Sequence, residues 1–166
     1  MYITTQTSPL GPLILISDGI YLTGLYLEQQ KHFLEGVSNN LERKDDLEIF
    51  KQTKSWLVQY FAGKNPNPND LKLKPAGTDF RKIVWKELLN IPYGTTITYK
   101  ELSHKVAKIL GRKTTSAQAI GQAVGHNPIS IIIPCHRVIG TTGNLVGYAG
   151  GISKKAYLLT LEKEKN

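Results

Sequence analysis

Cysteine is nearly absent from this sequence, which has only Cys135 among its 166 residues. A single cysteine cannot form a disulfide within the chain, so we expect an intracellular, cytoplasmic protein. One cysteine and four histidines provide no pair of ligands at the spacing of a zinc finger, so we predict no metal site. GxGxxG and P-loop patterns are also missing, so we expect no nucleotide cofactor.

Long hydrophobic runs are missing as well, and no stretch approaches the roughly 18 apolar residues of a membrane helix. The N-terminal segment 1–5 lacks the basic patch and apolar run of a secretory signal. Acidic residues are few, 13 against 21 lysines and arginines, which gives a net charge of +8. This excess indicates a polyanionic partner, nucleic acid before a membrane, with a basic but inert surface as the alternative.

The first half of the chain has the pattern of an α/β domain. Short apolar runs separated by turn residues predict strands within 1–30, with a hairpin at Asp18-Gly19. Apolar residues at helical spacing predict a helix over 46–62. Proline and asparagine then accumulate over 63–78. We therefore predict an N-terminal domain at 1–70, a linker at 71–77 and a C-terminal domain at 78–166.

The second half predicts a series of helices. Thr78 or Asp79 can cap one helix, and Thr98 with Glu101 forms a capping box for the next. After a basic turn, Ser116 can cap a helix over 117–126, so the outline is helix, turn, helix, as in DNA-reading motifs.

Beyond this motif the pattern changes twice. The apolar run 129–134 predicts a buried strand, and five glycines within 140–151 predict a loop. Ser153 is the expected cap of a last helix.

Cys135 is the candidate nucleophile. A lone cysteine is usually a small apolar core residue, but this one follows Pro134 and precedes His136 and Arg137. Both basic neighbours favour the thiolate, which is the reactive form. Glu162 could orient His136 in a nucleophile–base–carboxylate series, although a solvated charge on an exposed helix end is the simpler interpretation of Glu162.

Four motifs together resemble the O6-alkylguanine-DNA alkyltransferase family. They are Ile91-Pro92-Tyr93-Gly94-Thr95-Thr96-Ile97-Thr98-Tyr99, Gly125-His126-Asn127-Pro128, Ile133-Pro134-Cys135-His136-Arg137-Val138 and Gly147-Tyr148-Ala149-Gly150-Gly151. The resemblance is strong over 78–162 and weaker over 1–70. It implies an α/β fold in which a ribonuclease H-like N-terminal domain, a mixed sheet with a helix, precedes a mostly helical C-terminal domain with a winged helix-turn-helix.

The resemblance also implies an activity: transfer of an alkyl group from O6 of guanine, and possibly from O4 of thymine, to the protein's own cysteine, once per molecule. Cys135 would accept the alkyl group, His136 would act as a water-mediated base and Glu162 would hold His136. Asn127 would brace the turn around the site, and Arg137 would be structural. The expected partner is double-stranded DNA, with no membrane, no cofactor and a monomeric protein.

The base pocket is assigned by the same resemblance. Tyr99 would rotate a phosphate and hydrogen-bond the flipped guanine. The backbone of Val138 and the loop at Tyr148 and Ala149 would line the pocket. The family commonly has a serine in this loop, where this chain has Ala149.

The DNA contacts would come from the helix-turn-helix. Arg112, Lys113, Ala117 and Gln118 are the candidate residues, and residues 98–128 carry five basic side chains against one acid. Gln118 stands where the family has an intercalating arginine, so it keeps length and hydrogen bonding but loses the charge. The segment 108–115 is longer than the family pattern predicts.

Two other classes of protein compete with this interpretation. A helix-turn-helix regulator or a lesion-binding protein would need no acceptor, and the presence of Cys135 argues against the lesion-binding form. A cysteine hydrolase would need turnover and an oxyanion loop, and the sequence has no segment that we can identify as such a loop.

Overall fold

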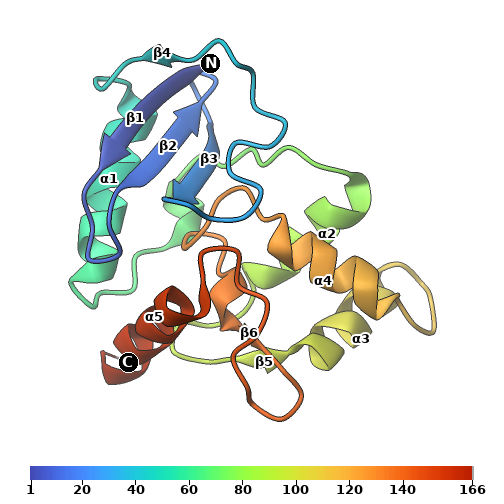
Figure 1. The fold of residues 1–166 in the computed structure, drawn as a ribbon. Helices are drawn as coiled ribbons and strands as arrows, with labels where there is room; N and C mark the ends of the chain where they lie inside the picture. The colour runs from blue at the N-terminus through green and yellow to red at the C-terminus, as the bar shows by residue number, and fades with distance from the viewer. Residues whose placement is uncertain (166) are drawn as a thin grey trace.

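Three consecutive antiparallel strands begin the chain in the computed structural model, which describes residues 1–165. They are β1 (Tyr2–Gln6), β2 (Leu13–Ser17) and β3 (Leu22–Leu27). The short strand β4 (Glu42–Arg43) adds to β1 in parallel, so the sheet is mixed, with the order β3-β2-β1-β4 (Figure 1). The predicted hairpin turn is confirmed: the Asp18 carboxylate accepts hydrogen bonds from the two N–H groups that follow Gly19.

Helix α1 (Glu48–Phe61) packs against β2 and β3, close to the range predicted for it. Its buried residues include Phe50 and Leu57, two of the apolar residues at helical spacing within 46–62. The segment that follows is not a free linker, because it contains a 3-10 turn, η1 (Pro68–Asp70), and its residues 72–74 exchange backbone hydrogen bonds with Leu22 of β3. The division of the chain into domains at 71–77 stays a prediction.

The second half is mostly helical. Helices α2 (Asp79–Leu88), α3 (Tyr99–Ile109) and α4 (Ala117–Gly125) pack against one another (Figure 1). Thr78, Thr98 and Ser116 cap them as predicted, and the Thr98 capping box is complete. Two-residue strands β5 (Ile97–Thr98) and β6 (Val138–Ile139) pair in parallel, and the 3-10 turn η2 (Cys135–Arg137) lies directly before β6.

Two expectations about local structure are wrong. Residues 129–134 form turns rather than a strand, and only Ile129 makes a bridge, to Leu25. Asn127 folds this segment back, since its side chain donates to the Ile133 carbonyl and accepts from the Ile129 N–H. The last helix, α5 (Ile152–Glu164), begins after Gly151 (φ 101°), so Ser153 lies within the helix and is not its cap.

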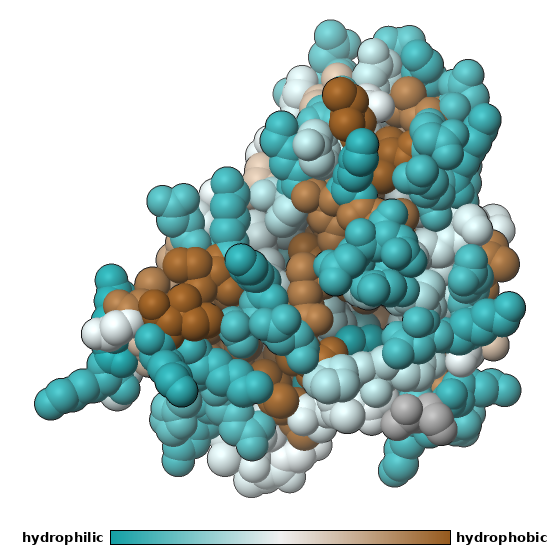
Figure 2. Space-filling view, turned by 180° about the vertical axis from the view of Figure 1, so that it is seen from behind, coloured by the Kyte–Doolittle hydropathy of each residue, from teal (hydrophilic) through white to brown (hydrophobic). Residues whose placement is uncertain are grey.

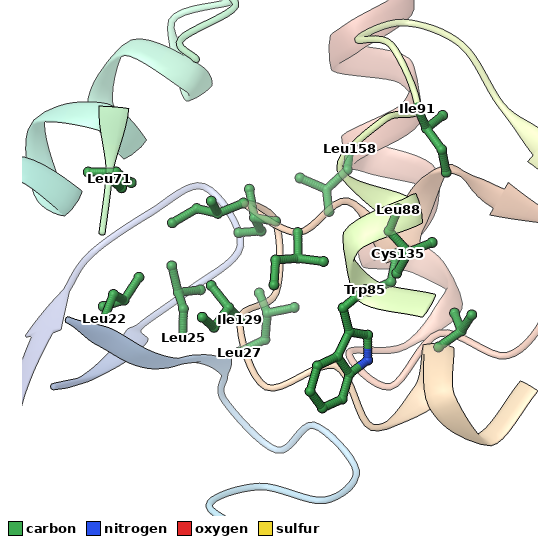
Figure 3. Close-up of a cluster of buried hydrophobic side chains, with 14 of the residues drawn as sticks. Leu22, Leu25, Leu27, Leu71, Trp85, Leu88, Ile91, Ile129, Cys135 and Leu158 are labelled. Atoms are coloured by element: carbon green, nitrogen blue, oxygen red, sulfur yellow. The ribbon is translucent and has the colours of Figure 1, made fainter. Parts of the chain in front are cut away.

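One core connects the two halves. Leu22, Leu25 and Leu27 of the sheet belong to the same buried cluster as Trp85, Leu88, Cys135 and Leu158 (Figure 3). Hydrophilic side chains cover most of the rear face, with hydrophobic ones in smaller groups between them (Figure 2). In the described part of the chain, no helix is both long and apolar enough to cross a membrane.

Candidate active site around Cys135

Cys135 begins the turn η2, where the folded-back segment 129–134 meets the helical half of the core. Its residue surface is only 5% exposed. The Asn127 side chain braces this turn, with its amide nitrogen 2.8 Å from the Ile133 carbonyl oxygen. The structure therefore holds Asn127 where its residue type can fix the backbone next to Cys135 and also contact the sulfur.

The thiol of Cys135 does not have the electrostatic environment predicted for it. Burial raises the pKa of Cys135 above its ordinary value, and this effect outweighs hydrogen bonds from the Asn127 side chain and the His136 backbone. Arg137 directs its charge to Glu162 rather than to the sulfur, and burial lowers the pKa of His136, so His136 is neutral at rest. The expectation that these two neighbours hold a thiolate is therefore wrong for the resting protein.

His136 and Glu162 form a buried pair. Nε2 of His136 lies 2.5 Å from Oε2 of Glu162, and both residues are 0% exposed. The simpler interpretation of Glu162 as a solvated surface charge is therefore wrong. Because a carboxylate only accepts, Nε2 carries the hydrogen of a neutral His136, and Nδ1 is left with its lone pair. Nδ1 is buried and makes no hydrogen bond within residues 1–165.

Glu162 is the central acceptor of this network. Its Oε2 also accepts from the Tyr60 hydroxyl at 2.6 Å, and its Oε1 accepts from Arg137 Nε at 2.7 Å and from the Gly94 N–H at 3.1 Å. Burial alone would raise the pKa of Glu162, but the hydrogen bonds from His136 and Arg137 and the charge of Arg137 lower it to about 2. Arg137 also donates to the Ile91 carbonyl, so its contacts are structural, as expected.

Two tyrosines lie near the sulfur. The charge of an ionised Cys135 contributes to the raised pKa values of both Tyr99 and Tyr148, after burial as the larger cause. The pKa of Tyr99 rises to about 12, so its phenol keeps its proton at neutral pH. The Tyr99 hydroxyl lies 3.3 Å from the Val146 carbonyl oxygen, and Gly147 passes so close that an added Cβ would approach that hydroxyl to 2.9 Å.

Lys155 completes the surroundings of Cys135. Its Nζ donates to the carbonyls of Val138 and Val146, at 2.5 and 2.9 Å, so it fastens the glycine-rich loop to β6. Burial lowers the pKa of Lys155, whereas a charged Cys135 raises it. The predicted pocket residue Val138 is fully buried, and its carbonyl is the acceptor of this bond.

A groove of about 610 Å³ runs beside this site, between α4 and the glycine-rich loop. Gln118, Tyr148 and Ala149 line it, together with Gly121, Gly125 and His126. The structure thus places two predicted features in one groove: the pocket loop at Tyr148 and Ala149, and Gln118, which stands where the family has an intercalating arginine. Cys135, Tyr99 and Val138 are not among the residues that line it.

The remaining predicted DNA-binding residues lie on the surface of α4 and of the turn that precedes it. Arg112 and Lys113 are exposed in the turn between α3 and α4, and Ala117 and Gln118 are exposed in the first turn of α4. All five basic residues of 98–128 are exposed: Lys100, Lys105, Lys108, Arg112 and Lys113.

Sequence reasoning missed Tyr60 and Lys155. Tyr60 lies 102 residues from its partner Glu162, and no local pattern could reveal that contact. Lys155 had a weak signal, because Lys155, Leu158 and Glu162 follow the i, i+3, i+7 spacing of one buried helix face. Two charged residues on such a face indicate buried polar contacts rather than solvated ones.

The fold and this buried cysteine–histidine–carboxylate series define a class of protein equipped for nucleophilic chemistry at one cysteine. Two family models match the chain. Residues 1–75 match the ribonuclease-like domain of 6-O-methylguanine DNA methyltransferase, and residues 79–164 match its DNA-binding domain.

Individual relatives match over nearly the whole chain. A methylated-DNA–protein-cysteine methyltransferase of Methanosarcina barkeri is 43% identical, over 98% of both chains. Its counterpart from Mycobacterium tuberculosis is 42% identical, over 97% of this chain and 92% of the other. The crystal structure of M. tuberculosis OGT in complex with DNA superposes with a TM-score of 0.88, at 41% identity, over 99% of this chain and 94% of that one. The chain belongs to the methylated-DNA–protein-cysteine methyltransferase family.

Proposed function

We propose that this protein repairs double-stranded DNA by moving an alkyl group from O6 of guanine to Sγ of Cys135, once per molecule. One observation carries the assignment of the acceptor. The single cysteine of a chain from this family lies next to a His136–Glu162–Arg137 series in which every link is buried. The acceptor, the base and the carboxylate come from one chain, which supports action as a monomer.

The tautomer of His136 supports its role as the base. Glu162 accepts a hydrogen bond from Nε2–H of His136. Nδ1 therefore keeps its lone pair and can accept the proton of Cys135, through a water molecule if the side chains diverge. Glu162 stays ionised at any pH near neutrality, because its pKa is about 2. It would therefore stabilise the imidazolium that forms as Cys135 is deprotonated.

The transfer is an in-line substitution at the alkyl carbon. The thiolate forms the new C–S bond while the C–O6 bond breaks, and the electron pair of that bond leaves with guanine. Tyr99, whose phenol stays protonated, would donate the proton that the departing guanine takes up. The product is a thioether, which has no easy route back to a thiol, so each molecule acts once and consumes no cofactor.

The target base must leave the helix before the sulfur can reach it, at a cost of a few kcal/mol. The groove between α4 and the loop 140–151 supports this step, since both Gln118 and Ala149 line it. We propose that α3 and α4 act as a winged helix-turn-helix whose α4 enters the minor groove, with Arg112 and Lys113 on the phosphates.

A duplex carrying one O6-methylguanine with a labelled methyl group tests this proposal. Label bound to protein at one equivalent supports the transferase. Repeated release of label into solution would instead identify a hydrolase, and binding without loss of label from DNA would identify a lesion-binding module. Either of the last two results would overturn the proposal.

A further inference from the structure

Two neighbouring side chains of the segment 28–41 meet a third, from the end of α4, at the rim of the groove. Nδ1 of His32 lies 2.5 Å from Oε2 of Glu35, and Nε2 of His126 lies 3.9 Å from the same oxygen. One ligand atom from each residue lies within 4.8 Å of the others. We propose that His32, Glu35 and His126 bind a divalent transition-metal ion of the zinc type. The site is separate from Cys135, and it differs from the expectation of no metal site, which rested on the spacing of zinc-finger ligands.

His126 is arranged in advance for this role. It is the C-cap of α4, and its Nδ1 lies 2.7 Å from the Gln122 carbonyl oxygen. A carbonyl only accepts, so Nδ1 carries the hydrogen and Nε2 keeps the lone pair that faces Glu35. Metal-binding histidines are typically fixed by such a hydrogen bond on the other ring nitrogen. The carbonyl end of α4 also favours a nearby positive charge.

The distances require only a small adjustment. Tetrahedral zinc holds nitrogen and oxygen ligands at about 2.0–2.2 Å, which places ligand atoms about 3.3 Å apart. Nε2 of His126 and Oε2 of Glu35 would therefore approach by roughly half an ångström. Nδ1 of His32 and Oε2 of Glu35, now 2.5 Å apart, would separate by somewhat under one ångström, and the ion would replace the hydrogen between them. The side chain of Glu35 is 58% exposed and that of His32 is 39% exposed, so both can adjust at the surface. Apart from the imidazole rings of His32 and His126, no buried side chain has to move.

The two imidazoles already lie against each other. The ring centroids of His32 and His126 are 3.6 Å apart, with 29° between the ring planes. Without a metal, the segment 28–41 is fastened here by this stack and by the backbone hydrogen bond from Lys31 to Ala149. A bound ion would add a stronger link between this segment and α4.

The location gives the site a consequence for the groove. His32 and His126 line the same groove as Gln118 and Tyr148. A divalent cation at this rim would fix one wall of the groove and add positive charge at the C-terminal end of α4. The proposal of a metal site does not depend on the alkyl transfer.

Titration of the full chain with Co²⁺, followed by absorption, and with Zn²⁺, followed by calorimetry, tests the site. We expect one ion per chain and a spectrum without a sulfur-to-cobalt charge-transfer band. His32→Ala and Glu35→Gln should each weaken binding at least tenfold. His104→Ala is the matched control, since His104 is exposed on α3 and outside the cluster, and it should bind as the wild type does.

Melting in the presence of EDTA shows whether each variant is folded before it is titrated. Zn²⁺ should then raise the melting temperature of the wild type and of His104→Ala, and leave that of His32→Ala unchanged. Equal affinity in all variants, a sulfur band that assigns the ion to Cys135, or no saturable binding at millimolar metal would each overturn the proposal. The cluster would then be an exposed histidine–carboxylate pair only.

Discussion

At the residue scale, Lys155 is a buried cation whose charge acts on the Cys135 thiol. Lys155→Met leaves the Val138 and Val146 carbonyls without their donor, at a cost of about 1–3 kcal/mol in the free energy of unfolding. It also removes the positive charge that favours the Cys135 thiolate. We expect alkylation by free O6-benzylguanine to slow about tenfold, which corresponds to roughly 1.4 kcal/mol.

Lys154→Met is the control for this substitution. Lys154 precedes Lys155 in α5, but its Nζ reaches only the Glu28 carbonyl at the surface. The two variants are compared by their rates of alkylation by free O6-benzylguanine and by their urea unfolding curves. If Lys154→Met slows alkylation as much as Lys155→Met does, the position of Lys155 beside the sulfur has no particular role.

Glu162 gives a prediction for stability against pH. Its pKa in the folded protein is about 2, below the ordinary value of 4.5, so its stabilising contribution is complete above pH 4.5 and disappears as the pH falls towards 2. A pKa lowered by this amount contributes about 3 kcal/mol to the free energy of unfolding at pH 7. His136 acts in the same direction at higher pH, since its lowered pKa means that acid below about pH 6.5 favours the unfolded chain.

Unfolding curves of Glu162→Gln should therefore lie about 3 kcal/mol below those of the wild type at pH 7, and the gap should narrow as the pH falls through 4 to 2. Glu164→Gln, at an exposed position of the same helix, should show no such gap. A difference between Glu162→Gln and the wild type that stays constant with pH would contradict the assigned ionisation of Glu162.

At the scale of elements, α4 and the turn before it carry the proposed contact with DNA. Gln118 is exposed in the first turn of α4 and lines the groove. A flipped base leaves a gap in the stack, and Gln118 can fill part of it. Gln118→Ala should therefore slow repair in duplex DNA far more than alkylation by free O6-benzylguanine, because the free base needs no flipping.

Gln118→Arg should keep activity and tighten binding to damaged duplex, since arginine adds a planar cation to the same position. The rate of repair in duplex DNA and the rate of alkylation by free O6-benzylguanine, measured in parallel, distinguish a residue that fills the gap in the stack from one that lines the base pocket. An equal loss of both rates in Gln118→Ala would mean that the residue supports the fold or the pocket.

The turn between α3 and α4 gives a separate prediction for salt dependence. Arg112 and Lys113 are exposed there, and each phosphate contact contributes about 0.9 to the slope of log affinity against log salt. Arg112→Ala with Lys113→Ala should make that slope shallower by up to about 1.8. Lys51→Ala with Lys64→Ala, an equal change of charge at exposed positions near α1, should leave the slope unchanged. If the two double variants have the same slope, the contact surface lies elsewhere.

At the scale of the whole molecule, the sequence predicts what local patterns determine. The hairpin at Asp18-Gly19 and the Thr98 capping box depend on neighbours within three residues, and both are confirmed. The segment 129–134 has the composition of a strand but forms turns, because the Asn127 side chain supplies hydrogen bonds that a partner strand would otherwise provide.

The sequence predicts which residues form the site better than it predicts their charge states. Cys135 and His136 stand in a motif, but the charge state of the thiol depends on burial and on Lys155, 20 residues away in the chain. The link between Tyr60 and Glu162 depends on how α1 and α5 pack together, which no spacing in the sequence encodes. Contacts of this kind decide pKa values, so they had to come from the structure.

Intact mass and peptide mapping after reaction with O6-methylguanine DNA test the proposed function most directly. The protein should gain one methylene equivalent, about 14 Da, as transfer to a nucleophile requires, and the added mass should lie on the peptide that contains Cys135. Cys135→Ala should still bind the duplex and gain no mass. A methyl group on any other residue, or more than one guanine repaired per protein molecule, would contradict stoichiometric transfer to Cys135.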